Sequence, residues 1–354
     1  MTTLTIGRHS VGTGQPVFIV AELSANHGQR LDIALATVRA AAQAGADAIK
    51  LQTYTPETMT LRSREPAFMV NAGLPGGGRP LFELYAEAQT PWEWHPPIKA
   101  EAEACGLEFF STPFDASAVH FLVELGVCAL KIASFELVDL PLIRAAAATG
   151  KPLIMSTGMA SLAEIDDAVQ AARSHGARDI VLLRCTSAYP APADSMRLRH
   201  IPLFRELFGV ATGLSDHTCG VAAAAAATAL GACVIEKHFI VSRDIGGPDA
   251  AFSLTPDEFK GMVTVVRDVE AASRGDAAQL HAIDEPAAKY RRSLWVVRDI
   301  ARGEAFTAQN VRSLRPALGL APKHWDEVMA QRAADAIAAG TPLAWSHLAG
   351  PDRR

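Results

Sequence analysis

The chain has 354 residues, of which 49% are hydrophobic and 20% are charged, and its formal net charge is −5. This length fits one large and one small domain, or two of equal size, and the apolar content excludes a disordered chain. The absence of a basic block argues against nucleic acid or a membrane surface as the main partner. The five cysteines form no Cys-x-x-Cys pair, which excludes a disulfide framework or a zinc finger.

The first ten residues, MTTLTIGRHS, lack the basic-then-apolar pattern of a secretion signal. The longest alanine-rich run, 221–235, is too short to span a membrane. We therefore expect a cytoplasmic location.

Short apolar runs alternate with helical stretches over the first 275 residues. Such continuous runs are typical of strands covered on both faces, as in a parallel sheet. The predicted strands are Val17–Ala21, Ala48–Gln52, Glu108–Ser111, Ala129–Ala133, Leu153–Ser156, Ile180–Arg184, Val210–Leu214 and Cys233–Phe239. Eight strand–helix repeats predict a (β/α)8 TIM barrel. The alternative is a doubly wound open sheet, but no Gly-x-Gly-x-x-Gly turn follows an early strand.

Capping boxes mark the starts of two predicted helices, at Ser161–Glu164 and at Thr255–Glu258. After Gly275 the pattern changes to short β-prone pieces interrupted by glycine and proline, namely 293–297, 299–303, 307–310, 312–316 and 338–343. The predicted organisation is a barrel over 1–275, a linker over 276–289 and a small β-rich domain over 290–354.

All eight predicted strands end in polar residues, and barrel enzymes gather their catalytic groups at these ends. A lysine buried in a barrel mouth costs several kcal/mol unless an anion meets it. Lys50 and Lys131 therefore predict a phosphorylated or carboxylated substrate, although Lys131 could also extend to the rim. Glu22 directly ends a buried strand and is a candidate general base.

Two histidines, His217 and His238, follow neighbouring strands, and such a pair suits Mn, Fe, Co or Zn. A purely structural role for either ring stays open. Of Glu236 and Lys237, at least one is expected to face outward in a solvated or inter-helix contact. Asp249 is either a turn residue or a substrate contact.

Several motifs in this order resemble the sialic acid synthase family, and the match runs nearly end to end. They are Glu22–His27, Lys50–Pro56, Ser111–Asp115, Lys131–Glu136, Ser156–Gly158, Gly213–Thr218 and Glu236–Phe239. Within that family, Ser24-Ala25, Tyr54–Pro56, Thr90–His95 and Ser134–Glu136 are similar to the subgroup that makes pseudaminic acid. Arg291–Leu294 and Arg315-Pro316 resemble the antifreeze-like (SAF) domain of these enzymes.

The resemblance implies a reaction in which phosphoenolpyruvate condenses with an open-chain aminosugar aldehyde, giving a nine-carbon 2-keto acid and phosphate by C–O cleavage. The sugar of the subgroup is 2,4-diacetamido-2,4,6-trideoxy-altrose, and the alternatives are the sugars of N-acetylneuraminate or legionaminate synthases. The resemblance also implies a divalent metal, Mn or Mg with Co as an option, on His217 and His238. It gives Glu22 the role of base for the attacking water.

The resemblance divides the remaining site residues between the two substrates. Phosphoenolpyruvate would contact Lys50, Thr112, Lys131, Ser134, Ser156 and Ser187, and the sugar would contact Gln52, Asn71, Glu136, Tyr189, Asp249 and Arg315. Arg315 would reach in from a second subunit, which implies a homodimer with exchanged C-terminal domains. Ser187 stands where sialic acid synthases proper have asparagine. Ala317 stands where glycine is common and would be strained if the backbone there needs a positive φ.

Two other classes of function stay open. A Schiff-base aldolase on the same barrel would use Lys131 as its nucleophile and would need no metal. An ice- or glycan-binding protein built around the C-terminal module would leave the barrel mouth dispensable.

Overall fold

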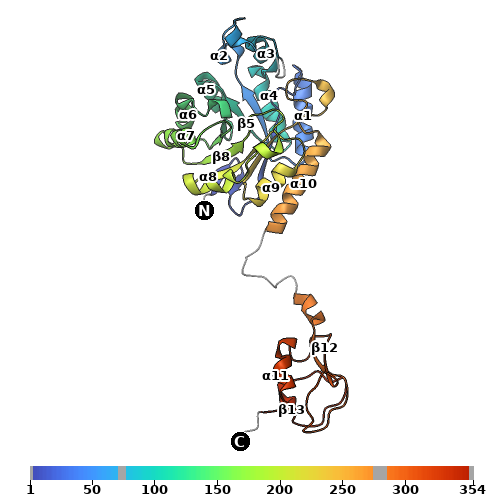
Figure 1. The fold of residues 1–354 in the computed structure, drawn as a ribbon. Coiled ribbons are helices and arrows are strands. Elements are labelled where there is room, and N and C mark those ends of the chain that lie inside the picture. The colour runs from blue at the N-terminus through green and yellow to red at the C-terminus, as the bar shows by residue number, and fades with distance from the viewer. Residues whose placement is uncertain (1–2, 71–76, 274–284, 351–354) are drawn as a thin grey trace. The chain divides into compact units, whose positions relative to one another are not determined.

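The computed structural model describes residues 3–70, 77–273 and 285–350. The chain divides into two compact units, Met1–Arg274 and Gly275–Arg354. Each unit has an apolar core of its own, and Figure 1 shows the fold.

Eight parallel strands close into a barrel in the first unit, in the order β10-β3-β4-β5-β6-β7-β8-β9. They are β3 (Phe18–Glu22), β4 (Ala48–Thr53), β5 (Glu108–Pro113), β6 (Leu130–Ile132), β7 (Leu153–Ser156), β8 (Ile180–Cys185), β9 (Ala211–Asp216) and β10 (Val234–His238). Every residue of β3, β8, β9 and β10 is buried, as expected for strands that are covered on both faces. The predicted barrel is confirmed.

Helices surround the strands (Figure 1). They are α1 (Leu31–Gln43), α2 (Pro56–Met59), α3 (Leu81–Ala88), α4 (His95–Ala104), α5 (Ala116–Leu125), α6 (Leu140–Ala147), α7 (Leu162–Ser174), α8 (His200–Phe208), α9 (Ala222–Ala229) and α10 (Pro256–Ser273). The predicted capping box of α7 forms, because Ser161 Oγ accepts from the Glu164 N–H at 3.3 Å while Glu164 accepts from the Ser161 N–H at 2.7 Å. Within the described ranges, no helix has both the length and the apolarity needed to cross a membrane.

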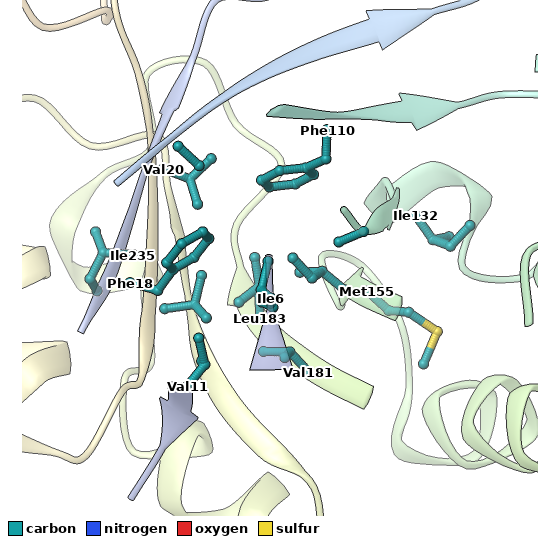
Figure 2. Packing of buried hydrophobic residues seen from close by; sticks show 14 of the residues in the cluster. Ile6, Val11, Phe18, Val20, Phe110, Ile132, Met155, Val181, Leu183 and Ile235 are labelled. Atoms are coloured by element: carbon teal, nitrogen blue, oxygen red, sulfur yellow. The ribbon is translucent and has the colours of Figure 1, made fainter. Parts of the chain in front are cut away.

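A β-hairpin that the sequence did not predict, β1 (Thr3–Ile6) with β2 (His9–Gly12), precedes the barrel. Its Ile6 and Val11 are fully buried in the same apolar cluster as Phe18 of β3 (Figure 2). The last residue of the hairpin and the three that follow it, 12–15, share a cavity wall with Cys233, which directly precedes β10. The hairpin therefore lies at the amino-terminal end of the barrel, and the carboxyl ends of the strands stay available for a site.

The second unit contains two short antiparallel pairs, β11 (Ser293–Val296) with β12 (Val311–Leu314) and β13 (Arg332–Ala333) with β14 (Leu348–Ala349). The pieces 299–303, 307–310 and 338–343 form isolated bridges or loops rather than the predicted strands. The helix α11 (Trp325–Met329), which was not predicted, contributes Val328 to the core. Over 285–350 no residue other than glycine has a positive φ, so Ala317 is not strained in the way considered above.

Candidate active site

A cavity of about 190 Å³ opens at the carboxyl ends of the barrel strands, and all eight strands contribute to its wall. Eleven residues predicted from the sequence line it, namely Glu22, Lys50, Gln52, Thr112, Lys131, Ser134, Ser156, Tyr189, His217, His238 and Asp249. Ser187 and Glu136 are not part of this wall, and Arg315 belongs to the other unit. Asn71 lies outside the described residues.

Four charged side chains form a buried charge cluster in the cavity, Glu22, Lys50, Lys131 and Glu236. Lys50 Nζ lies 2.7 Å from Glu22 Oε2 and 3.6 Å from Glu236 Oε1, and Lys131 Nζ lies 3.4 Å from the same Glu236 atom. Lys131 is only 2% exposed, so its extension to the rim is excluded. The chain's own two carboxylates meet the lysines, so the burial of the lysines does not by itself require a substrate anion.

Burial and the neighbouring charges shift the pKa of each side chain in the buried charge cluster. Burial lowers the pKa of Lys50, but the carboxylates of Glu22 and Glu236 together raise it by more, so the pKa of Lys50 lies above its ordinary value. Burial lowers the pKa of Lys131 more than Glu236 raises it. Burial raises the pKa of Glu22, whereas Lys131 and Lys50 overcome burial at Glu236 and lower its pKa. Glu22 therefore gains basicity, which suits a group that accepts a proton.

Glu236 and Lys237 differ from the prediction, because neither side chain is solvated. Glu236 lines the cavity, while Lys237 is fully buried and donates to Asp216 Oδ2 at 2.7 Å and to the Thr218 carbonyl. The strand β10 is covered on both faces, so each charge needs a partner of its own. Sequence reasoning missed Glu236 as a site residue, although strand parity places it on the same face as His238.

Hydroxyl groups surround the glycine that follows β7. Ser134 Oγ accepts from the Gly158 N–H at 3.1 Å, and a Cβ on Gly158 would lie only 2.3 Å from Ser187 Oγ. Ser187 therefore adjoins Ser134 although it is not part of the cavity wall. Over the described residues, the buried Oγ atoms of Ser156 and Ser187 have no hydrogen-bond partner. Buried hydroxyls without partners are available to bind a ligand.

The two histidine rings fit a pair of metal ligands. Their centroids are 5.3 Å apart, and the buried Nδ1 of His238 has no hydrogen-bond partner among the described residues. Burial lowers the pKa of His238 well below its ordinary value, so the ring is neutral, which is the form that binds metals. His217 Nδ1 faces the Thr186 carbonyl at 2.9 Å, which orients this ring. The described part of the chain holds no group of three or more His, Cys, Asp or Glu side chains suited to a metal.

A second polar group lies beside the charge cluster. Gln52 Nε2 donates to Glu22 Oε1 at 3.1 Å and to Ser24 Oγ at 2.9 Å, and Ser24 Oγ donates to Asp249 Oδ2 at 2.5 Å. Tyr189 lies over the His217 ring with centroids 4.4 Å apart. Sequence reasoning did not select Ser24, and among the further lining residues it also did not select Tyr54, Tyr85, Cys185 and Ser215.

The remaining predicted residues lie apart from the cavity wall. Burial raises the pKa of Glu136 to about 7, and its buried Oε2 has no partner among the described residues. Arg315 is exposed on the second unit.

Together, a closed parallel barrel and a strand-end cavity with buried lysines, carboxylates, hydroxyls and two imidazoles define a (β/α)8-barrel enzyme. The family model described as the NeuB family matches residues 37–278, and the SAF domain model matches residues 291–349. The chain belongs to the NeuB family.

Individual relatives support this assignment. A pseudaminic acid synthase from Helicobacter pylori is 44% identical over 330 residues, which cover 93% of this chain and 97% of that protein. An N,N'-diacetyllegionaminic acid synthase from Legionella pneumophila is 34% identical, covering 95% of this chain and 96% of that protein. The crystal structure of an N-acetylneuraminic acid synthetase from Leptospira borgpetersenii has a TM-score of 0.73 at 31% identity and covers 81% of this chain and 95% of that one.

Proposed function

We propose that this chain is a pseudaminic acid synthase, a transferase that forms a C–C bond. It condenses phosphoenolpyruvate with 2,4-diacetamido-2,4,6-trideoxy-altrose and releases a nine-carbon 2-keto sugar acid and phosphate. The observation that carries this proposal is the strand-end cavity, whose wall holds two buried lysines and the Ser156 hydroxyl, which has no partner among the described residues. The 44% identity to a pseudaminic acid synthase over nearly the whole chain supports the choice of sugar.

Phosphoenolpyruvate binds at the lysine and hydroxyl side of the cavity. Lys50 and Lys131 meet its negative charges, and Thr112, Ser134, Ser156 and Ser187 donate hydrogen bonds to its oxygens. Carbon 3 of phosphoenolpyruvate attacks the aldehyde carbon, and water adds to carbon 2. Glu22 accepts the proton of that water, and the bond between carbon 2 and the phosphate oxygen breaks.

His217 and His238 would hold a divalent metal ion, Mn or Mg with Co as an option. When bound, such an ion would supply Lewis-acid chemistry toward the aldehyde oxygen and the water. The neutral state of His238 and the hydrogen bond that orients His217 support this assignment.

The sugar binds on the other side of the cavity, where Gln52, Tyr189 and Asp249 lie. We assign Asn71, Glu136 and Arg315 to the same substrate from the resemblance. The second candidate is a synthase for legionaminate or N-acetylneuraminate, which uses the same chemistry on another aminosugar. The 34% identity to an N,N'-diacetyllegionaminic acid synthase supports this second candidate.

Phosphate release tests the proposal, with phosphoenolpyruvate, Mn and a panel of aminosugars. We expect the altrose derivative to give the highest kcat/KM, and a preference for N-acetylmannosamine would overturn the choice of sugar. Activity that resists a chelator, together with borohydride trapping of substrate on Lys131, would instead establish a Schiff-base aldolase.

The proposed location is the cytoplasm.

We also propose a homodimer in which Arg315 of each copy completes the site of the other. Mixing two inactive variants tests this arrangement. Arg315→Ala and Glu22→Ala are each expected to be inactive alone. When the two variants are mixed in equal amounts and subunits exchange, half of the dimers contain one copy of each variant. Each mixed dimer then has one complete site, so about a quarter of the wild-type activity returns. A mixture that stays inactive contradicts the exchanged arrangement.

A further inference from the structure

Ser24 has a backbone conformation that serine adopts at a cost. Its φ is +48°, in the left-handed region where glycine is favoured. The residue is 3% exposed and follows β3 in a tight turn, which the Asn26 N–H closes on the Leu23 carbonyl at 3.0 Å. A residue without a side chain would form the same turn with less strain, so the hydroxyl needs an explanation of its own.

The turn is held by contacts that do not involve Ser24. Asn26 Nδ2 donates to the Phe239 carbonyl at 3.0 Å and to Ser253 Oγ at 2.8 Å. Ser253 Oγ in turn donates to the backbone carbonyl of Asp249 at 2.6 Å. These bonds connect the turn after β3 to the segment after β10, and they impose the strained conformation from outside. The backbone is therefore fixed without help from the Ser24 side chain.

The Ser24 hydroxyl joins two groups of the cavity wall. It donates its single proton to Asp249 Oδ2 at 2.5 Å and accepts from Gln52 Nε2 at 2.9 Å. Its donor is consumed in this way, so it acts through Asp249 and Gln52 rather than as a donor to the substrate. Asp249 lies in the segment that follows β10 and Gln52 lies in β4, and the hydroxyl bridges the two.

We propose that Ser24 is a positioning residue that fixes Asp249 and Gln52 in the arrangement that selects the sugar. This inference rests on the proposed function, in which Asp249 and Gln52 contact that substrate. It adds a residue that determines which aminosugar fits, without touching phosphoenolpyruvate. Loss of the hydroxyl removes the partner that Asp249 and Gln52 share, so Asp249 samples other rotamers and Gln52 keeps only its bond to Glu22.

Two variants separate the hydroxyl from the backbone. Ser24→Gly removes the hydroxyl and relieves the strain, so folding is not at risk. Ser24→Ala removes the hydroxyl and keeps the strain. We expect both variants to raise the KM for the altrose derivative at least tenfold and to lower its kcat/KM relative to other aminosugars at least tenfold. The KM for phosphoenolpyruvate stays within twofold of the wild-type value.

Arg197→Gly is the matched control, because Arg197 also has a positive φ, of +44°, but is exposed and does not line the cavity. It should leave both KM values unchanged. A Ser24→Gly variant with the wild-type sugar KM and selectivity would overturn the inference. A wild-type protein that does not use the altrose derivative would overturn the proposed function instead, so the two failures are distinguishable.

Discussion

Lys50 Nζ and Glu22 Oε2 form a 2.7 Å ion pair, and both side chains are almost fully buried. The pair connects the neighbouring strands β3 and β4, in which Glu22 and Lys50 are opposite each other in the register. In our proposal the same two side chains serve different purposes, since Lys50 binds an anion and Glu22 accepts a proton. Their contact means that each sets the charge state of the other.

Removal of Lys50 should therefore destabilise the fold. Lys50→Met leaves Glu22 and Glu236 buried with less compensation, and loss of one partner of a buried pair costs about 3–5 kcal/mol. The pKa of Glu22 already lies above its unfolded value and rises further in the variant. A carboxyl with a raised folded pKa loses stability as the pH rises from its unfolded value of 4.5 through the folded pKa, so the deficit is larger at pH 8 than at pH 4.5.

Denaturant unfolding at both pH values measures this effect. Lys99→Met is the control, since Lys99 pairs with Glu103 on the exposed face of α4 and the change should stay below about 1 kcal/mol. Equal losses for Lys50→Met at the two pH values would refute the coupling.

Gly158→Ala should weaken phosphoenolpyruvate binding. The new Cβ would lie 2.3 Å from Ser187 Oγ and 2.8 Å from Ser134 Oγ, so both hydroxyls must move. A hydrogen bond to a charged group contributes about 1.5–3 kcal/mol, so we expect the KM for phosphoenolpyruvate to rise about tenfold or more. The sugar KM should change little. Steady-state kinetics measure both, and an unaltered phosphoenolpyruvate KM in a folded variant would contradict the assignment of these serines.

Metal removal tests the histidine pair. Dialysis against a chelator should abolish phosphate release, and Mn should restore it. His238→Ala should also lose Mn binding, measured directly from the electron paramagnetic resonance signal of free Mn. His120→Ala is the matched control, because His120 is an exposed histidine on α5. If His238→Ala binds Mn as the wild type does, the histidine pair is not the metal site.

Glu136 should give the fold a pH dependence near neutrality. Burial raises its pKa to about 7, above the value of 4.5 for an unperturbed glutamate. Its contribution to stability is therefore complete below the unfolded pKa and is lost as the pH rises through about 7. We expect the unfolding free energy of the wild type to fall more steeply from pH 5 to pH 8 than that of Glu136→Gln. The exposed substitution Glu57→Gln is the control, and equal slopes for all three proteins would rule the effect out.

Two glycines should respond to alanine in opposite ways. A Cβ on Gly213 in β9 would lie 2.3 Å from the Val234 carbonyl oxygen, which is backbone and cannot rotate away. Gly213→Ala should thus cost about 1–3 kcal/mol or more. Gly261 lies inside α10 with open space around it, so Gly261→Ala should stabilise by about 0.5–1 kcal/mol. Thermal and denaturant unfolding distinguish these outcomes, and a stable Gly213→Ala variant would contradict the barrel packing.

The barrel could be predicted because each buried strand is a short apolar run with a polar end. The carboxyl ends of parallel strands converge, so strand order alone brought Glu22, Lys131 and His238 to one cavity. The partners of the lysines could not be found in this way. Glu236 and Lys237 are adjacent charges in one strand, and only the three-dimensional neighbours show that one faces Lys131 and the other Asp216.

Local conformation was harder to predict. The left-handed turn at Ser24 depends on Asn26 contacts with residues more than 200 positions away, which no local pattern reveals. The hairpin β1–β2 was missed because each strand has only four residues: β1 alternates exposed and buried residues over too short a span, and β2 does not alternate. In the second unit, bridges between single residues replaced strands that propensity favoured.

The cavity wall contains residues from barrel strands and residues from the loops that follow the strands. Lys131 and Ser156 lie on barrel strands, whereas Tyr189 and Asp249 lie in the segments that follow strands. A substitution in a strand perturbs the whole barrel, but loop residues can be exchanged with little effect on stability. The same scaffold can therefore acquire a new sugar preference by evolution of its loops, while the residues proposed for phosphoenolpyruvate stay under the constraint of the sheet.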